Sequence, residues 1–171
     1  MLQTERLTIE PLTLDDAPFI LALLNDPDFI AQIADRGVRD EAAARRYLEE
    51  GPLASYRQHG FGLWAVRLRG GDAIGVCGLL RRETLADVDI GYALLPQARG
   101  RGFAREAAQA VVLYARETLG LARLVAVVAP GNAPSRALLA SLGFGHESTV
   151  QLTSDAENLC LYGWDASEPV A

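Results

Sequence analysis

The chain has 171 residues, 50% of them hydrophobic and 22% charged, with a formal net charge of −6. This composition predicts one globular domain with a sizeable core, and no apolar run approaches the roughly 20 residues that span a bilayer. The negative charge disfavours nonspecific binding to nucleic acid. The first residues lack the basic-then-apolar order of a secretory signal, so we expect a cytoplasmic protein without nucleic-acid or membrane partners. Cys77 and Cys160 lie in apolar stretches without metal-ligand spacing, which predicts buried free thiols.

The N-terminal part reads as a strand followed by two helices. Arg6–Leu12 alternates apolar and polar residues as a half-buried strand does. Thr13 is followed by two acidic residues, a pattern typical of a helix N-terminus, and apolar residues then recur at helical spacing. A second helix has Asp40 as its expected N-cap and ends before Gly51.

The rest of the chain predicts six further strands, one of them wholly apolar with a helix before it and a helix after it. Arg123–Ala129 has no polar residue after Arg123, as in a central strand covered on both faces. The expected order is β-α-α-β-β-β-α-β-α-β-β, with one domain over residues 1–165 and a tail over 166–171. The predicted elements are a hairpin (61–69 and 73–83), a strand (Val88–Leu95), a helix (101–118), the apolar strand, a short helix (132–143) and two closing strands (144–152 and 158–164).

The stretch Gln97–Ala104, QARGRGFA, joins a strand to a helix and has the features of an anion site. A helix start offers unpaired N–H groups and the positive end of a dipole, and glycines at 100 and 102 let the backbone approach a phosphate. Arg99 and Arg101 add positive charge nearby. A plain structural turn stays as the alternative, and neither Gly-Lys-Ser/Thr nor G-x-G-x-x-G is present to indicate a nucleotide-binding loop.

A second segment follows the apolar strand. Asn132 is placed to cap the next helix, and Ser135 lies in its first turn. In isolation, these two residues are a helix cap and a first-turn serine and nothing more.

The two segments together resemble the GNAT superfamily of acyl-CoA N-acyltransferases, over roughly residues 2 to 165. Gln97–Gly102 resembles the family pattern Gln/Arg-x-x-Gly-x-Gly/Ala, and Asn132-x-x-Ser135 running to Phe144 resembles its second signature. QTERLTIEPLTLDDA and DIGYALLPQARGRGFAREA are similar to the RimJ/RimL-like branch, which acetylates alanine N-termini of ribosomal proteins.

The resemblance implies an α/β (α+β) GNAT fold: a single mixed, mostly antiparallel sheet of about seven strands with about four flanking helices. Its fourth and fifth strands, here Val88–Leu95 and Arg123–Ala129, run parallel and splay apart, with Gly91 a candidate bulge. It implies acetyl-CoA as co-substrate, with pyrophosphate on the backbone amides of Arg99 to Ala104 and pantetheine paired with Ala93 to Leu95 like an added strand. It assigns these residues to acetyl-CoA: Ala93, Leu94, Leu95, Gln97, Arg99, Gly100, Arg101, Gly102, Phe103, Ala104, Asn132 and Ser135.

Acyl transfer to an amine requires a base, and the resemblance directs attention to Asp89, where the branch usually carries glutamate. A polar residue on a half-exposed strand is the alternative for Asp89. The tyrosine that many members use as acid is replaced here by Leu139, so Ser135 is the candidate acid, with Tyr92 and Tyr162 as lesser ones.

The resemblance therefore predicts an N-acetyltransferase that acts on a protein N-terminus or a small-molecule amine. The alternatives are a GNAT-fold module that binds CoA without turnover and, less favoured, a nucleotide-binding protein. The acceptor site is expected from the first two helices, the Phe29–Asp40 loop and the last hairpin, none of which carries a readable motif. No metal is expected, and a homodimer stays open.

Overall fold

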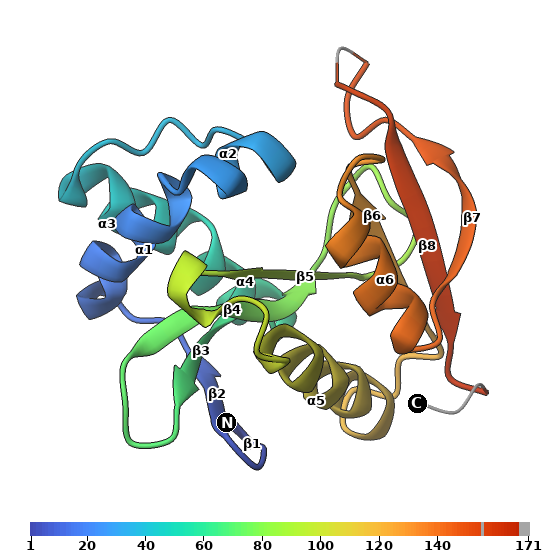
Figure 1. Cartoon of the computed structure of the whole chain (residues 1–171), viewed down its shortest axis with the longest axis horizontal. Helices are drawn as coiled ribbons and strands as arrows, with labels where there is room; N and C mark the ends of the chain where they lie inside the picture. The colour runs from blue at the N-terminus through green and yellow to red at the C-terminus, as the bar shows by residue number, and fades with distance from the viewer. Residues whose placement is uncertain (155, 168–171) are drawn as a thin grey trace.

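A single eight-stranded sheet, in the order β1-β2-β3-β4-β5-β6-β8-β7, runs through the protein (Figure 1). The structure is a computed structural model and describes residues 1–154 and 156–167. All neighbouring strands are antiparallel except β5 and β6, which are parallel. The strands are β1 (Leu2–Gln3), β2 (Leu7–Pro11), β3 (Leu63–Leu68), β4 (Ala73–Leu80), β5 (Asp89–Leu94), β6 (Arg123–Val128), β7 (Gly145–Val150) and β8 (Leu159–Asp165).

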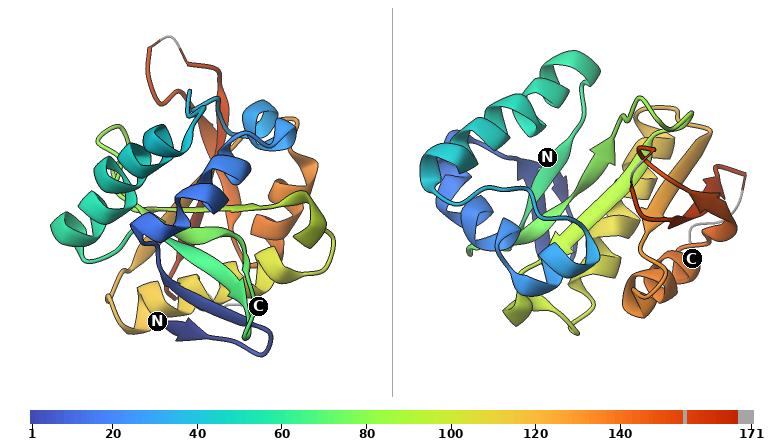
Figure 2. Two further views of the ribbon diagram at one scale, coloured as in Figure 1. Left: turned by 90° about the vertical axis from the view of Figure 1, so that its left-hand side faces the viewer. Right: turned by 90° about the horizontal axis from the view of Figure 1, so that it is seen from above.

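Helices cover both faces of the sheet (Figure 2). Side chains of α1–α3 pack with Ala65, Val76 and Ala93 in one core, whereas those of α5 and α6 pack with the opposite face in a second core. We call these the α1–α3 face and the α5–α6 face. The helices are α1 (Ala17–Leu24), α2 (Pro27–Gln32), α3 (Glu41–Glu50), α4 (Pro52–His59), α5 (Phe103–Glu117) and α6 (Ala133–Ser141), with 3₁₀ turns η1 (Leu14–Asp16) and η2 (Pro96–Ala98).

The predicted helix caps are confirmed. The Asp40 carboxylate accepts from the Ala43 N–H at 2.7 Å, and the Asn132 side chain accepts from the Ser135 N–H at 3.2 Å. The Thr13 N–H donates to the Asp16 carboxylate at 2.8 Å. The first two bonds each satisfy a backbone N–H that the first helical turn leaves unpaired. The third fixes the chain that enters the helical turn.

The mixed sheet and its parallel pair are confirmed, and three further elements are present. Strand β1 has only two residues, too few to show a period. α2 lies partly inside the segment expected as a loop, and α4 starts at Pro52 directly after Gly51. Proline suits the first helical position because its missing N–H has no partner there, so the glycine that ends α3 does not end helical structure.

The expected bulge at Gly91 is wrong, because β4 and β5 pair in unbroken register with Gly91 opposite Gly78. A Cβ at Gly91 would lie 2.8 Å from the Leu80 Cδ1 atom, so the end of the Leu80 side chain would have to shift to make room for it. Cys77 and Cys160 are buried and free, as predicted.

The far C-terminus is only partly described. Of the predicted tail 166–171, residues 168–171 lie outside the described residues, and the Ala166 N–H donates to the Ala122 carbonyl at 2.8 Å. Within the part of the chain that the structure describes, no helix combines the length and apolar character needed to cross a membrane.

Candidate functional site

Strands β5 and β6 are joined at one end only. In the described residues they share a single register pair, Asp89 opposite Val125, and the Val125 N–H donates to the Val88 carbonyl at 3.0 Å. β6 continues to Val128 and β5 to Leu94 with no further pairing between them. The parallel strands therefore diverge toward their C-terminal ends, as the resemblance to the GNAT superfamily implies.

The divergence leaves backbone donors on the edge of β5. The Leu95 N–H donates to the carbonyl of Ile74 in β4 at 2.8 Å, so it points to the β4 side. Because successive N–H groups along a strand point to opposite edges, those of Leu94 and Tyr92 point to the edge that β6 leaves. A ligand with amide groups can pair with this edge as an added strand would.

Directly beyond β5, the backbone turns into α5 with a run of open donors. Gly100 and Gly102 have φ of 70° and 80°, values that L side chains rarely adopt, and α5 begins at Phe103 without a side-chain cap. Within the described residues, the N–H groups of residues 100–104 donate to no protein acceptor. Such a run at a helix start binds an anion such as a phosphate.

The Arg99 and Arg101 side chains are directed elsewhere. The Arg99 guanidinium hydrogen-bonds Asp26 at the start of α2, Asp28 at 2.5 Å and the Leu94 carbonyl at 3.0 Å. The Arg101 guanidinium lies over the Phe103 ring, 4.9 Å from its centre. The backbone of this turn, more than its arginine side chains, presents the donors for an anion.

Asp89 is a buried carboxylate at the joined end of the pair. It is 1% exposed, and the Arg82 Nε–H lies 3.1 Å from both of its carboxylate oxygens. Burial raises the pKa of the Asp89 carboxyl, and the Arg82 guanidinium opposes that shift. Since side chains alternate along β5, Asp89 lies on the same face as Ala93, the α1–α3 face.

Ser135 lies across the divergence, at the start of α6. Its hydroxyl is 2.7 Å from the Tyr92 hydroxyl, which also donates to the Ser135 carbonyl at 3.2 Å. Burial raises the pKa of Tyr92 to about 12, while the bond with Ser135 opposes the shift. Tyr92 lies on the α5–α6 face, so the two predicted catalytic residues flank β5 on opposite faces and do not touch.

Comparison with known proteins identifies the family of the chain. The family model for the acetyltransferase (GNAT) domain matches residues 6–145. The chain belongs to the GNAT acetyltransferase family. N-acetyltransferase p20 of Bacillus licheniformis is 31% identical over 152 residues, which are 88% of this chain and 85% of that protein.

Solved structures of GNAT proteins share the fold. An acetyltransferase from Agrobacterium tumefaciens is 30% identical, with a TM-score of 0.77 over 95% of this chain and 92% of that one. RimJ of Mycobacterium smegmatis, solved in complex with CoA-disulfide, is 21% identical, with a TM-score of 0.78 over 94% of this chain and 82% of that one. The second likeness bears on the fold alone. As a GNAT acetyltransferase, the chain is an acyltransferase enzyme, and the enzymes of this family use acetyl-CoA.

The remaining candidate residues have structural contacts. Leu139 is buried in the core of the α5–α6 face, and the Tyr162 hydroxyl accepts from Arg136 Nε at 3.0 Å. His59 stacks on Phe61, and His146 meets Tyr162 edge to face. No group of three or more His, Cys, Asp or Glu side chains that could hold a metal ion occurs among residues 1–154 and 156–167.

Two residues of this GNAT site were missed by the sequence analysis. Arg82, which pairs with Asp89, lies just past the end of β4, and folding Leu80 opposite Asp89 in the β4–β5 hairpin brings the two together. Hairpin register was the signal that could have found it. Arg6, which contacts the turn before α5, is 95 positions from Arg101 and carried no such signal.

Proposed function

We propose that this enzyme moves the acetyl group of acetyl-CoA to a primary amine by direct attack in a ternary complex. The donor's pyrophosphate would lie on the N–H groups of residues 100–104, and its pantetheine arm along the free edge of β5 from Ala93 to Leu95. Asn132 and Ser135 would line the other side of the arm. The divergence of β5 from β6, with open donors continuous into α5, is the observation that carries this proposal.

The thioester carbonyl would lie against β5. Attack by the amine nitrogen forms a C–N bond, puts negative charge on the carbonyl oxygen, and then breaks the C–S bond. The N–H of Leu94, pointing to the free edge, is placed to stabilise that oxygen. The Arg99 Nε–H donates to the Leu94 carbonyl at 3.0 Å, which fixes the next peptide group, between Leu94 and Leu95, and so restrains the backbone beside this N–H.

Asp89 is the proposed base. The attacking amine must lose a proton, and a carboxyl whose pKa lies above the usual range is a better acceptor at neutral pH than an ordinary one. The Arg82 guanidinium opposes the rise in the pKa of Asp89, since it stabilises the charged carboxylate. The short side chain and 1% exposure favour transfer through a bridging water.

Ser135 is the proposed acid for the leaving sulfur. Its hydroxyl would give a proton to the thiolate. The Tyr92 hydroxyl, 2.7 Å away, would turn from the Ser135 carbonyl to pass its proton to Ser135, and solvent would return a proton to Tyr92. A CoA-like thiol resembles cysteine, with a pKa near 8.5. The acid is therefore expected to contribute less to the rate than the base.

The proposed acceptor is a peptide N-terminus or a small amine, as in the RimJ/RimL-like branch that the opening and central segments resemble. An α-amine with a pKa near 8 loses its proton more easily than a lysine side chain near 10.4. The formal net charge of −6 suits a cationic acceptor. Asp89 faces the α1–α3 side, where α1, α3 and the chain between them, which includes α2, would form the acceptor site together with the β7–β8 hairpin.

Calorimetry with acetyl-CoA and with ATP tests the donor. We expect binding of acetyl-CoA only, and Gly102→Val should raise its dissociation constant at least about tenfold, because a β-branched residue is strained at a φ of 80°. Preference for ATP, or unchanged affinity in the variant, would place the donor elsewhere.

Thiol release with a panel of amines and peptides then tests turnover. Release that depends on one acceptor class identifies the substrate. Tight acetyl-CoA binding without release for any amine would instead favour a CoA-binding module.

A further inference from the structure

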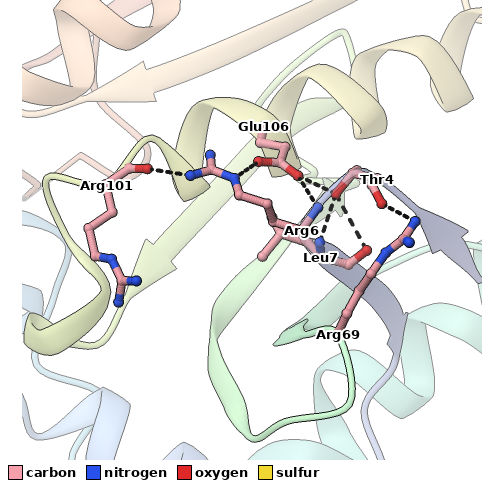
Figure 3. A network of polar contacts seen from close by, with 6 residues as sticks. All are labelled: Thr4, Arg6, Leu7, Arg69, Arg101 and Glu106. Atoms are coloured by element: carbon pink, nitrogen blue, oxygen red, sulfur yellow. Dashed lines mark hydrogen bonds and ion pairs between the residues drawn. The ribbon is translucent and has the colours of Figure 1, made fainter.

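The N-terminal segment is bound to the first turn of α5 through one carboxylate (Figure 3). One Glu106 oxygen accepts from the Thr4 hydroxyl at 2.5 Å and from the Arg6 N–H at 2.9 Å, and the other accepts from Arg6 Nε at 2.6 Å. These bonds hold the pKa of Glu106 below its usual range although burial opposes them. The segment is thus fixed at the helix start, where a negative side chain is also favoured by the dipole.

Arg6 makes a second contact, with the turn that precedes α5. Its Nη1 donates to the Arg101 carbonyl at 2.9 Å, and its guanidinium lies 4.6 Å from the centre of the Phe103 ring. Its Nη2 would be 3.3 Å from a Cβ at Gly102. One guanidinium therefore joins Glu106, Arg101 and the start of the helix, and Figure 3 shows it between them.

The bond to the Arg101 carbonyl fixes the orientation of a whole peptide group. A trans peptide is planar, and its C=O and N–H point in opposite directions. With the Arg101 oxygen held by Arg6, the Gly102 N–H of the same peptide group must point away from Arg6. Gly100 and Gly102 permit other backbone conformations in this turn, so the orientation needs such a restraint.

We infer that Arg6 is a positioning residue for the donor site, which orients the Gly102 N–H and its neighbours toward the pyrophosphate of acetyl-CoA. The inference rests on the proposed function, because it assumes the pyrophosphate at residues 100–104. Arg6 acts through the backbone and through Glu106, and its Nε and Nη1 groups are occupied by these contacts.

Arg6→Met tests the inference, with Arg69→Met as a matched control. Arg69 binds the same segment through the Thr4 carbonyl but does not touch the turn. By calorimetry, Arg6→Met should raise the dissociation constant of CoA about tenfold, the value of one lost hydrogen bond of about 1.4 kcal/mol. Phosphate-free pantetheine should bind both variants as it binds the wild type. The KM for acetyl-CoA should rise while kcat and the acceptor KM stay within about twofold.

Arg6→Lys covers the case in which Arg6→Met does not fold. An ammonium can keep the charge beside Glu106 but does not reproduce the fork that also reaches the Arg101 carbonyl, so CoA binding should again weaken several-fold. Full CoA affinity in either variant, or equal loss in Arg69→Met, would overturn the inference. If Gly102→Val also leaves CoA binding unchanged, the proposed donor site itself is wrong, and the two failures are thereby distinguished.

Discussion

Among single residues, Asp89 combines a chemical use with a cost to folding. Burial raises the pKa of its carboxyl above the ordinary value of 3.8 despite the Arg82 guanidinium. A carboxyl with a raised pKa in the folded state destabilises the protein above that pKa, because the unfolded chain ionises more easily. Asp89→Asn should therefore raise the denaturant midpoint at pH 7 while it slows turnover.

The pH dependence of this difference checks its origin. The stability of the wild type should fall relative to Asp89→Asn as the pH rises from 3.8 through the raised folded pKa, and the two should converge below that window. Urea unfolding of both proteins between pH 3 and pH 8 measures it. Equal midpoints at pH 7 would show that Arg82 fully compensates the buried charge.

Arg82 gives a second prediction at this scale. Its charge lowers the pKa of Asp89, so Arg82→Gln should move the acidic limb of the kcat profile to higher pH. Arg82 also opposes the burial-driven rise in the pKa of Tyr47 on α3, which places its charge toward the α1–α3 side. Asp89→Asn should abolish the acidic limb of the kcat profile. Any increase of kcat with pH that comes from deprotonation of the amine acceptor should persist in both variants. A uniform loss of rate without a shift would make Arg82 merely structural.

Between elements, Arg99 joins the donor turn to α2. It pairs with Asp26, a buried carboxylate that also caps α2 by accepting from the Phe29 N–H at 3.0 Å, and with the exposed Asp28. Arg99→Gln should leave α2 less firmly held, so the acceptor KM should rise several-fold while the affinity for acetyl-CoA changes by less than about twofold. Because the guanidinium is partly exposed, we expect an unfolding free energy lower by about 1–2 kcal/mol.

Asp28→Asn is the matched control for this variant. The Asp28 side chain is 73% exposed, and exposed ion pairs contribute about 0–1 kcal/mol, so both stability and acceptor KM should stay near the wild type. A large rise in the acetyl-CoA dissociation constant of Arg99→Gln would instead show that the Arg99 side chain binds phosphate.

For the molecule as a whole, local patterns predicted the layers and long-range contacts completed the site. Two sequence patterns identified an outer and a central strand: the alternation of Arg6–Leu12 and the apolar run at Arg123–Ala129. A strand buried on one face alternates polar and apolar residues, whereas a strand buried on both faces is apolar throughout. The glycine turn before α5 was identified for a similar reason, since its backbone conformation depends on residues 100 and 102 themselves.

The polar partners could not be predicted in this way. The partners in Arg99–Asp26 and Arg6–Glu106 are 73 and 100 positions apart, and the spacing of residues in the sequence does not indicate such pairs. The contact of Tyr92 with Ser135 depends on where α6 packs across the divergence, which is a property of the folded sheet. The candidate donor turn was thus visible in the sequence, whereas the groups that hold it in place became visible only in three dimensions.

The divergence of β5 and β6 leads to the last prediction, on the whole sheet. If acetyl-CoA pairs with β5, the amides of Leu94 and of residues 100–104 should exchange hydrogen quickly in the free protein and become protected on binding. The Leu95 amide, already bonded to Ile74, should change little and serves as the internal control. Binding should also stabilise the protein by about 2.7 kcal/mol at a ligand concentration of 100 times Kd. Protection confined to other elements would contradict the added-strand arrangement, because a ligand bound along β5 and the turn before α5 must cover the amides of Leu94 and of residues 100–104.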